Sequence, residues 1–328
     1  MNILTVYILS YNRSELLKKS IQTILNQSII DSISLQIYDN NSSFNIDDIV
    51  DHFDNVSISV IRHSSNLGST GNFKAAFFAP KQTDYFCIFH DDDLMHPNYC
   101  ESAVKYLDSH PDISWVAAES HLFSSSPDLY QNRHKQSCSF QSYLPAELSK
   151  ALILSNVDFT FCSVIYRSSS LSIIDSNTFD NLLSKYSIIM DRPLLFDIIT
   201  TGSKCAITKS KMINSYIHLG QDSKTGPVQF DNIISLLDKY IHLAFLSSSC
   251  NYIDKLFFKL WISYNLIDGY QRTTNSFIDT LAFRQYNVQR LFGVSSIFHL
   301  YLNCFCYRIV LFYKKIVRIC KSLALVCS

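Results

Sequence analysis

Short apolar segments alternate with amphipathic segments along the first 120 residues. The apolar segments are rich in β-branched and aromatic residues, and they occupy residues 3–9, 35–38, 56–61, 85–89 and 114–118. Between them, apolar residues recur at helical spacing, as at Leu17, Ile21 and Ile24. The apolar segments are nearly continuous, as expected for strands of a parallel sheet that helices cover on both faces. The pattern therefore predicts a doubly wound α/β domain.

This alternation loosens after residue 145. The pattern there predicts a helix at 146–154, a strand at 159–166, a helix after Asp191, and strands at 205–208 and 213–217. A loop with two glycines and a proline at 220–227 is the strongest boundary signal, so we predict a domain at 1–220 and a second region at 221–328. Apolar periodicity predicts that this region is helical, at 233–246, 252–267, 277–292 and 297–326.

Polar residues follow four of the predicted strands. They are Ser10-Tyr11-Asn12-Arg13, Asp39-Asn40-Asn41-Ser42, the segment from Arg62-His63 to Asn66, and His90-Asp91-Asp92-Asp93. In an open α/β sheet, ligands bind beyond the carboxyl ends of the strands. We therefore predict a functional site at this edge of the sheet.

Three adjacent carboxylates, Asp91, Asp92 and Asp93, follow the fourth strand. Neighbouring carboxylates repel one another unless a cation compensates their charge. Hard divalent ions such as Mg²⁺ or Mn²⁺ take oxygen ligands and often share them with substrate phosphates. The alternative is a solvated acidic turn that caps the helix predicted to begin near Pro97. The position at a strand end favours the metal site.

Three other candidates near the strand ends each have a structural alternative. The stretch from Asn66 through Gly68 to Asn72 precedes a helix and could approach an anion through its backbone, or it could be an ordinary loop and helix cap. Asp39 could accept hydrogen bonds from a base or ribose, or form a turn. Tyr11 could stack on a base, although a buried tyrosine is the commoner case.

Two further candidates lie later in the chain. Asp191 precedes Arg192-Pro193 and is either a general base or the N-cap of the helix that follows. His218 ends a strand-like segment and is either a metal ligand through its neutral imidazole or a structural residue.

Composition narrows the class of protein. The chain has 328 residues, of which 17% are charged and 13% aromatic, so it can bury a large core and is not intrinsically disordered. The ten cysteines form no C-x-x-C pair, and the N-terminus lacks the charged region of a secretory signal. Free thiols without export predict a cytoplasmic protein.

The net charge is zero, but its distribution is uneven. Residues 280–328 contain seven basic residues and no acidic one. A spanning helix needs about 20 mostly apolar residues, and Arg308 within the apolar stretch 291–313 would cost roughly 2.5–3.5 kcal/mol on insertion scales. This pattern favours a peripheral helix on the anionic, cytoplasmic face of a membrane over a nucleic-acid partner. The alternatives are a helix packed on its own domain and an oligomer contact.

Four motifs, in order and spacing, resemble the family-2 glycosyltransferases of the GT-A fold. They are residues 6–13 (VYILSYNR), 39–42 (DNNS), Asn66-Leu67-Gly68 with Asn72, and the strand that ends in Asp91-Asp92-Asp93. The match is thinner from Phe159 to Gly220, where 163–167 (SVIYR), Asp191 and His218 recur in similar order. The resemblance implies a Rossmann-like, mostly parallel sheet flanked by helices, here with a C-terminal helical extension. It also implies an inverting enzyme of bacterial surface-polysaccharide type.

The resemblance assigns roles to individual positions. Tyr11 would pack against the base of a nucleotide-diphosphate sugar, and Asp39 would bond that base. Asp91 would hold the ribose or donor sugar and contribute to the metal site, and Asp93 would ligate the Mg²⁺ or Mn²⁺ that bridges the diphosphate. Asp191 would deprotonate the hydroxyl of a saccharide acceptor, which the basic tail suggests is lipid-linked, and His218 would contact the metal or diphosphate. The remaining donor-binding candidates are Arg13, Asn66, Gly68, Asn72 and Asp92.

Two positions depart from the family pattern. Many members carry an arginine where Gly71 stands, so either Lys74 or Arg62 supplies that positive charge here or the donor contacts differ. Most members carry a glycine after the second strand, where this chain has Asn41.

Two other functions use similar elements. A sugar-phosphate nucleotidyltransferase also combines an α/β nucleotide domain with carboxylate-bound Mg²⁺, but such enzymes usually have a Gly-rich loop after the first strand, and residues 10–13 contain no glycine. A non-catalytic nucleotide-sugar-binding protein would use the tail to recruit partners.

Overall fold

The computed structural model describes residues 2–53, 58–123, 138–153, 156–199, 202–217 and 230–245, together with 260–261, 305–306 and 309. The chain divides into two compact units. The first comprises Met1–Pro145, Asp158–Asn181 and Leu194–Gly226, and the second comprises Ala146–Val157, Leu182–Pro193 and Pro227–Ser328. The predicted boundary at residue 220 lies outside the described residues, as do almost all residues of the helices predicted beyond 246.

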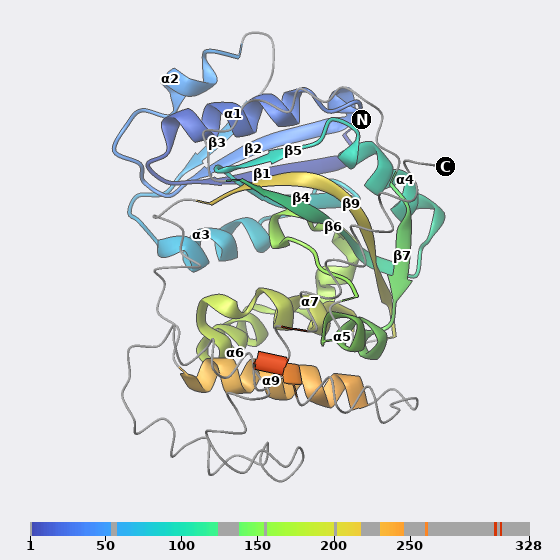
Figure 1. Ribbon diagram of the computed structural model, residues 1–328. Coiled ribbons are helices and arrows are strands. Elements are labelled where there is room, and N and C mark those ends of the chain that lie inside the picture. The colour runs from blue at the N-terminus through green and yellow to red at the C-terminus, as the bar shows by residue number, and fades with distance from the viewer. Residues whose placement is uncertain are drawn as a thin grey trace. The chain divides into compact units, whose positions relative to one another are not determined.

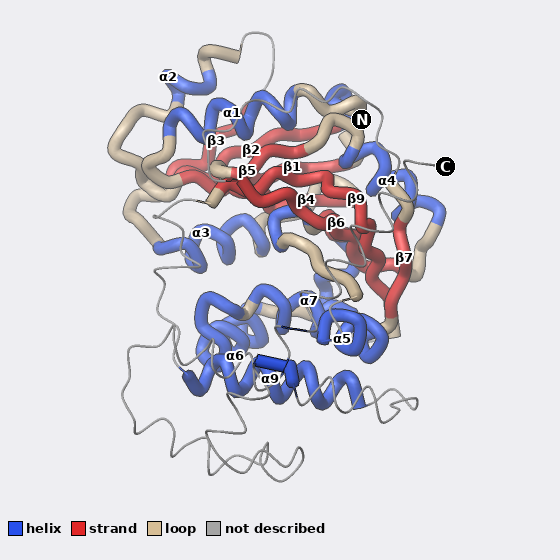
Figure 2. Tube along the Cα trace, in the orientation of Figure 1, coloured by secondary structure: helices blue, strands red, loops and turns tan. Residues whose placement is uncertain are grey.

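Within the described residues, one nine-stranded sheet forms the centre of the first unit (Figures 1 and 2). Its strands are β1 (Leu4–Ser10), β2 (Ile33–Asp39), β3 (Ile58–Arg62), β4 (Tyr85–His90), β5 (Asp93–Met95), β6 (Ile113–Phe123), β7 (Phe140–Tyr143), β8 (Ile165–Arg167) and β9 (Lys204–Tyr216). Their order is β3-β2-β1-β4-β8-β6-β9-β5, with β7 also paired to β9. Strands β1 to β4 pair in parallel, and β6 is parallel to β9. This topology confirms the predicted α/β fold with a mostly parallel sheet.

Helices alternate with these strands, and the sequence pattern predicts all of them except those at 47–50 and 176–186. The helices are α1 (Ser14–Leu25), α2 (Asp47–Val50), α3 (Gly68–Phe77), α4 (Tyr99–Ser109), α5 (Pro145–Ile153), α6 (Ser176–Tyr186), α7 (Asp191–Ile199) and α9 (Phe230–Phe245). Short 3₁₀ helices span Ile30–Ser32, Phe161–Ser163, Ser168–Ile173 and Ser187–Ile189. Figure 1 shows α1 and α3 on opposite faces of the sheet. The sheet is therefore covered on both sides, which explains its continuous apolar strands.

One face of the sheet carries a mainly aliphatic core. Alternate side chains of a strand point to opposite faces, so Leu4, Val6 and Ile8 of β1 lie on the same side. All three are fully buried in one cluster with Leu17 and Ile21 of α1. The apolar residues whose 3.6-residue spacing predicts α1 are therefore the ones that pack against the sheet.

The opposite face carries an aromatic core beneath α3. Phe86 of β4 stacks on Tyr166 of β8 with ring centroids 4.7 Å apart. Phe77 of α3 meets both rings edge-on, at 6.2 Å and 6.1 Å, and Tyr7 of β1 contacts Phe86 at 6.1 Å. These offset and edge-on geometries are the favoured ones for aromatic pairs. They seat β8 against β4, in the middle of the sheet.

The second unit is built on α5 and α9. The Ser149 hydroxyl of α5 donates a buried hydrogen bond to the Tyr240 carbonyl of α9 at 2.6 Å. The Asn232 amide of α9 donates to the Lys185 carbonyl at 2.8 Å. Helix α5 was predicted at 146–154, and α9 matches the helix predicted at 233–246.

Several elements differ from the sequence-based prediction, and three of them bear on the site. The strand predicted at 159–166 is reduced to β8, because residues 161–163 form a 3₁₀ helix. The two strands predicted at 205–208 and 213–217 are one strand, β9, interrupted only by register shifts against β6. Asp93, the last residue of the acidic run, begins β5, which pairs antiparallel with β9 so that Asp93 lies opposite Ser215. This pairing brings the end of β9 to the carboxylates.

Candidate active site

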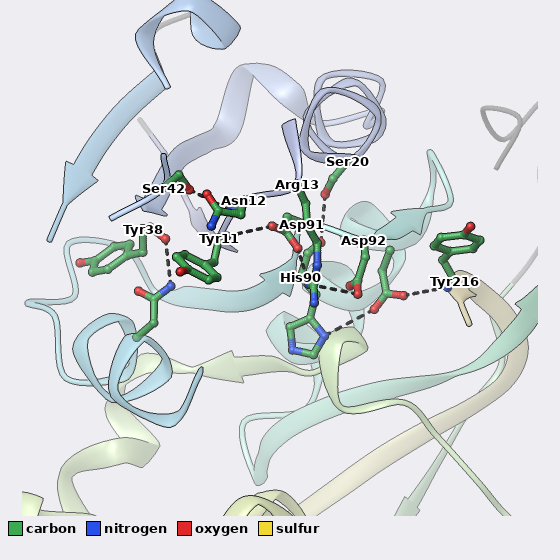
Figure 3. Close-up of polar contacts among 12 residues, drawn as sticks. Tyr11, Asn12, Arg13, Ser20, Tyr38, Ser42, His90, Asp91, Asp92 and Tyr216 are labelled. Atoms are coloured by element: carbon green, nitrogen blue, oxygen red, sulfur yellow. Dashed lines mark hydrogen bonds and ion pairs between the residues drawn. The ribbon is translucent and has the colours of Figure 1, made fainter. Parts of the chain in front are cut away.

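The ends of β1, β2 and β4 meet at one edge of the sheet. Their parallel register pairs Ser10 with Asp39 and Leu9 with His90. We call the residues at these strand ends, 10–13, 39–42 and 90–93, the polar edge. Figure 3 shows that Tyr11, Arg13, Asp91 and Asp92 lie together there. The topology thus gathers the side chains that the sequence places at three separate strand ends.

Arg13 compensates part of the acidic charge. Its Nη1 lies 3.0 Å from Asp91 Oδ1 and 3.3 Å from Asp92 Oδ2 (Figure 3). Asp91 Oδ2 accepts a hydrogen bond from the Tyr11 backbone N–H at 3.1 Å. Burial raises the pKa of Asp91 to about 6, although the Arg13 guanidinium works in the opposite direction. One guanidinium faces two carboxylates here, so Arg13, Asp91 and Asp92 together keep a net negative charge when both carboxylates are ionised.

Asp93 lies apart from Arg13 and has different partners. Its Oδ1 accepts a hydrogen bond from the Tyr216 backbone N–H at 3.3 Å, and its Oδ2 lies 3.6 Å from His90 Nδ1. Desolvation lowers the pKa of His90, but the hydrogen bond to Asp93 and the nearby carboxylates outweigh it and raise that pKa to about 9. Asp93 is thus a buried carboxylate at the point where β4, β5 and the end of β9 meet.

Asp39 is fully buried yet keeps an unused acceptor. Its Oδ1 accepts from the Ser42 backbone N–H at 3.1 Å, which makes the turn that the sequence offered as one interpretation. Its Oδ2 lies 3.2 Å from Arg62 Nη1 but accepts no hydrogen bond from the residues that the structure describes. Buried acceptors are normally satisfied. This oxygen can therefore accept a hydrogen bond from a ligand.

Two asparagines hold the loops after β1 and β2 in the left-handed region. Asn12 has φ 54° and Asn41 has φ 63°. The Asn12 N–H donates to Ser42 Oγ at 3.0 Å, and the Asn12 Oδ1 accepts from the Ser43 N–H at 2.8 Å. These hydrogen bonds join the loop after β1 to the loop after β2. Asparagine tolerates positive φ better than other non-glycine residues. Asn41 therefore forms the turn where family members usually have glycine.

Replacing Asn41 by alanine is expected to destabilise the protein. A left-handed backbone costs an ordinary L-residue roughly 1–2 kcal/mol, so the Asn41→Ala variant should lose about 1 kcal/mol of unfolding free energy. The measurement is urea denaturation followed by circular dichroism. Asn41→Gly is the matched control and should retain wild-type stability, since glycine has no Cβ to strain. Equal loss in both variants would contradict a conformational origin.

Internal hydrogen bonds hold the stretch before α3. Asn66 Oδ1 accepts from Asn40 Nδ2 and from the Gly68 N–H, both at 2.8 Å, and Gly68 has φ 72°. Asn72 is buried; its Nδ2 donates to the Tyr38 carbonyl at 3.0 Å, and its Oδ1 lies 2.9 Å from His63 Nε2. These contacts are those of a structural loop. The substrate-binding roles of Asn66, Gly68 and Asn72 stay predictions.

The structure gives a packing reason for glycine at position 71. A Cβ there would lie 2.8 Å from Leu67 Cβ, closer than real side chains approach. The two cations suggested as replacements for arginine already have acidic partners: Lys74 pairs with Asp180, and Arg62 pairs with Asp39. Arg62 also donates to the Phe44 carbonyl at 3.1 Å. The arginine that pairs with the acidic run is Arg13.

Three other predicted site residues differ in where they lie. Tyr11 is 41% exposed, so its ring can stack on a ligand. Asp191 is the first residue of α7, half-buried and assigned to the second unit. His218 lies outside the described residues.

Sequence reasoning missed two side chains beside Asp93. The sequence pattern places His90 only at the start of a polar run, and it does not single out Cys162 among the ten cysteines. A nitrogen of His90, a carboxylate oxygen of Asp93 and the sulfur of Cys162 all lie within 4.8 Å of one another. The histidine could have been found from its place beside three carboxylates. Cys162 could not, because only the pairing of β8 with β4 brings it near.

Comparisons with known proteins agree with this geometry. The family model described as glycosyl transferase family 2 matches residues 5–173, just over half of the chain. None of the curated proteins matches. Among solved structures, S. aureus TarS 1–349 in complex with UDP-GlcNAc has a TM-score of 0.55 and 12% identity, covering 88% of this chain and 78% of that one. The same TarS fragment with UDP has the same TM-score, identity and coverage of this chain, and 80% of its own length is covered. At this identity the likeness concerns the fold.

Proposed function

The chain belongs to glycosyl transferase family 2 and is a glycosyltransferase, and from that premise we propose that it uses a nucleotide-diphosphate sugar as donor and inverts the anomeric centre. The acceptor that we propose is a hydroxyl of a lipid-linked saccharide, as in assembly of bacterial surface polysaccharides. The observation that carries the proposal is the polar edge, where Asp91 accepts a hydrogen bond from the Tyr11 N–H and Asp39 ends the strand next to β1, beyond the carboxyl ends of the strands. Ligands of open α/β sheets bind at that position.

The nucleotide half of the donor suits the residues after β1 and β2. Tyr11 offers an exposed ring to a base, and Asp39 Oδ2 offers a buried acceptor to a base N–H or ribose hydroxyl. The TarS structures with UDP-GlcNAc and UDP support a nucleotide-diphosphate ligand for this fold. Arg13 would lie near the donor phosphates, where its charge favours binding.

The donor set at the polar edge fits a divalent ion. Asp91 and Asp93 supply buried carboxylate oxygens, which Mg²⁺ and Mn²⁺ prefer, and one arginine does not neutralise the acidic run. We propose that Asp93 and Asp91 hold the ion, with His218 as a further ligand. When bound, such an ion acts as a Lewis acid that stabilises negative charge on the departing nucleoside diphosphate.

Asp191 is proposed as the general base. A carboxylate at the start of α7 would accept the proton of the acceptor hydroxyl as that oxygen attacks the anomeric carbon. Attack on the face opposite the leaving diphosphate inverts the configuration. The family resemblance supports this role, and the half-buried position keeps the carboxylate accessible to an acceptor.

The basic tail supports a membrane-bound acceptor. Residues 280–328 combine seven cations with apolar residues, a composition that favours an anionic lipid surface. We propose a cytoplasmic enzyme that works peripherally at the membrane face. Among the residues that the structure describes, no helix combines the length and apolar character needed to span a bilayer.

The test is transfer by the purified full chain. Nucleotide-diphosphate sugars would be supplied one at a time with Mn²⁺ and a lipid-linked saccharide in vesicles, with and without anionic lipid. We expect one donor to yield glycosylated acceptor and nucleoside diphosphate in equal amounts, with inversion, loss of activity in chelator and faster turnover on anionic vesicles.

Pyrophosphate release from a nucleoside triphosphate and a sugar phosphate would instead identify a nucleotidyltransferase. Donor binding without transfer to any acceptor would indicate a binding protein, and equal rates on both vesicles would contradict the membrane role.

A further inference from the structure

A mixed set of three ligand atoms combines two residues of the polar edge with a cysteine from outside it. His90 at the end of β4, Asp93 at the start of β5 and Cys162 in the 3₁₀ helix Phe161–Ser163 each offer one atom within 4.8 Å of the others. His90 Nδ1 and Asp93 Oδ2 are 3.6 Å apart. This separation suits two ligands of one ion. The three residues come from separate elements that only the fold brings together.

The backbone around Cys162 is held firmly in place. Ser163 Oγ donates to the Thr160 carbonyl at 2.6 Å and accepts from the Ala118 N–H at 2.9 Å. The Cys87 thiol contacts the Cys162 carbonyl at 3.6 Å. The 3₁₀ helix is thereby anchored to β6 and to β4. Cys162 is 1% exposed, so its position beside Asp93 is fixed by buried contacts.

The chemistry of this set differs from that of the acidic run. Mg²⁺ and Mn²⁺ favour oxygen ligands, whereas one imidazole nitrogen, one carboxylate oxygen and one thiolate suit Zn²⁺. Zinc sites with three protein ligands keep a fourth position open for water or a substrate. The His90 side chain is 40% exposed, so an ion can reach the buried pair from the solvent side.

We propose that His90, Asp93 and Cys162 bind Zn²⁺ in a site that competes with the oxygen-ligated ion of the donor. On binding, a zinc–sulfur bond forms, and the thiol proton of Cys162 and the imidazolium proton of His90 both leave to solvent, so that the sulfur binds as thiolate and His90 as the neutral imidazole. Asp93 is shared, so a zinc-loaded chain cannot offer this carboxylate fully to a donor-bound ion. Zinc therefore inhibits sugar transfer. The binding stands on geometry alone, and only the inhibition rests on the proposed function.

Cobalt(II) is the direct probe of the thiolate ligand. Titration of the purified full chain with Co²⁺ should produce the near-ultraviolet thiolate-to-cobalt charge-transfer absorption, and excess Zn²⁺ should abolish it. Cys162→Ser should lose this band. Cys138→Ser, which removes another free thiol outside the cluster, should retain it. His90→Gln should keep the band but weaken Zn²⁺ binding by at least about tenfold, the scale on which even outer-shell partners act.

The outcomes separate this site from the proposed function. A band that persists in Cys162→Ser, or no band in the wild-type chain, overturns the zinc site whatever the transfer assay shows. A band that depends on Cys162 in a chain that transfers no sugar supports the site and rejects the proposed function. In an active chain, Zn²⁺ should inhibit the wild type more strongly than Cys162→Ser, each relative to its own Mg²⁺ activity. Equal inhibition would overturn the competition.

Discussion

Replacing Asp93 by asparagine should lower kcat/KM for sugar transfer by at least about 100-fold, because Lewis-acid stabilisation of the leaving group contributes several kcal/mol. The substitution removes the charge that would hold the ion. It keeps the Oδ1 acceptor that bonds the Tyr216 N–H, so the pairing of β5 with β9 should survive. The measurement is steady-state transfer with Mn²⁺ varied at saturating donor. The variant should also require more Mn²⁺.

Asp112→Asn provides the matched control for loss of a carboxylate. Asp112 belongs to the same unit but is exposed, and it pairs with Lys204 at 3.0 Å, away from the polar edge. That variant should transfer sugar at the wild-type rate with unchanged Mn²⁺ dependence. Circular dichroism and thermal unfolding would verify that both variants fold. Wild-type transfer by folded Asp93→Asn would refute the assignment of Asp93.

Replacing Asp191 by asparagine should lower kcat by about 10²–10⁴-fold, the usual contribution of general-base catalysis. Asparagine preserves the shape of the side chain but cannot accept the proton of the acceptor hydroxyl. The affinity for the donor should be unchanged, because Asp191 has no proposed contact with it. Calorimetric titration with donor, together with single-turnover transfer, would measure the two effects separately.

Asp197→Asn is the control on the same helix. Asp197 lies within α7 and is also half-buried, so the change removes a similar charge without touching the proposed base. We expect near-normal kcat in this variant. A parallel loss of donor affinity and kcat in Asp191→Asn would mean that Asp191 binds the donor. Normal turnover would place the base elsewhere.

The strands of the first unit could be predicted from sequence because they are buried on both faces. Runs such as residues 3–9 and 85–89 are almost entirely apolar, and they appear as β1 and β4. The polar edge could be predicted for a related reason, since parallel strands end together. The ends of the apolar segments are therefore enough to predict that Asp39 and Asp91 lie at a common edge of the sheet.

The remaining features depend on contacts between distant residues. Nothing local distinguishes 93–95 as a strand, because β5 exists only through its pairing with β9. The sequence identifies Arg13 as a candidate, but it does not predict the ion pairs with Asp91 and Asp92, because these residues lie far from Arg13 in the sequence. The same holds for Cys162, which a 3₁₀ helix places beside Asp93 where an uninterrupted strand was predicted.

The place of β8 has a consequence for how the chain is made on the ribosome. β8 lies between β4 and β6, although both are synthesised before it. Until residue 167 has emerged, β4 presents an unpaired border to other nascent or misfolded chains, which is an aggregation hazard. β4 and β6 therefore cannot join in one sheet until this three-residue strand has been synthesised, and β5 must wait longer still for β9. Slow synthesis between residues 90 and 167 would prolong the exposure, and chaperone binding should concentrate in that interval.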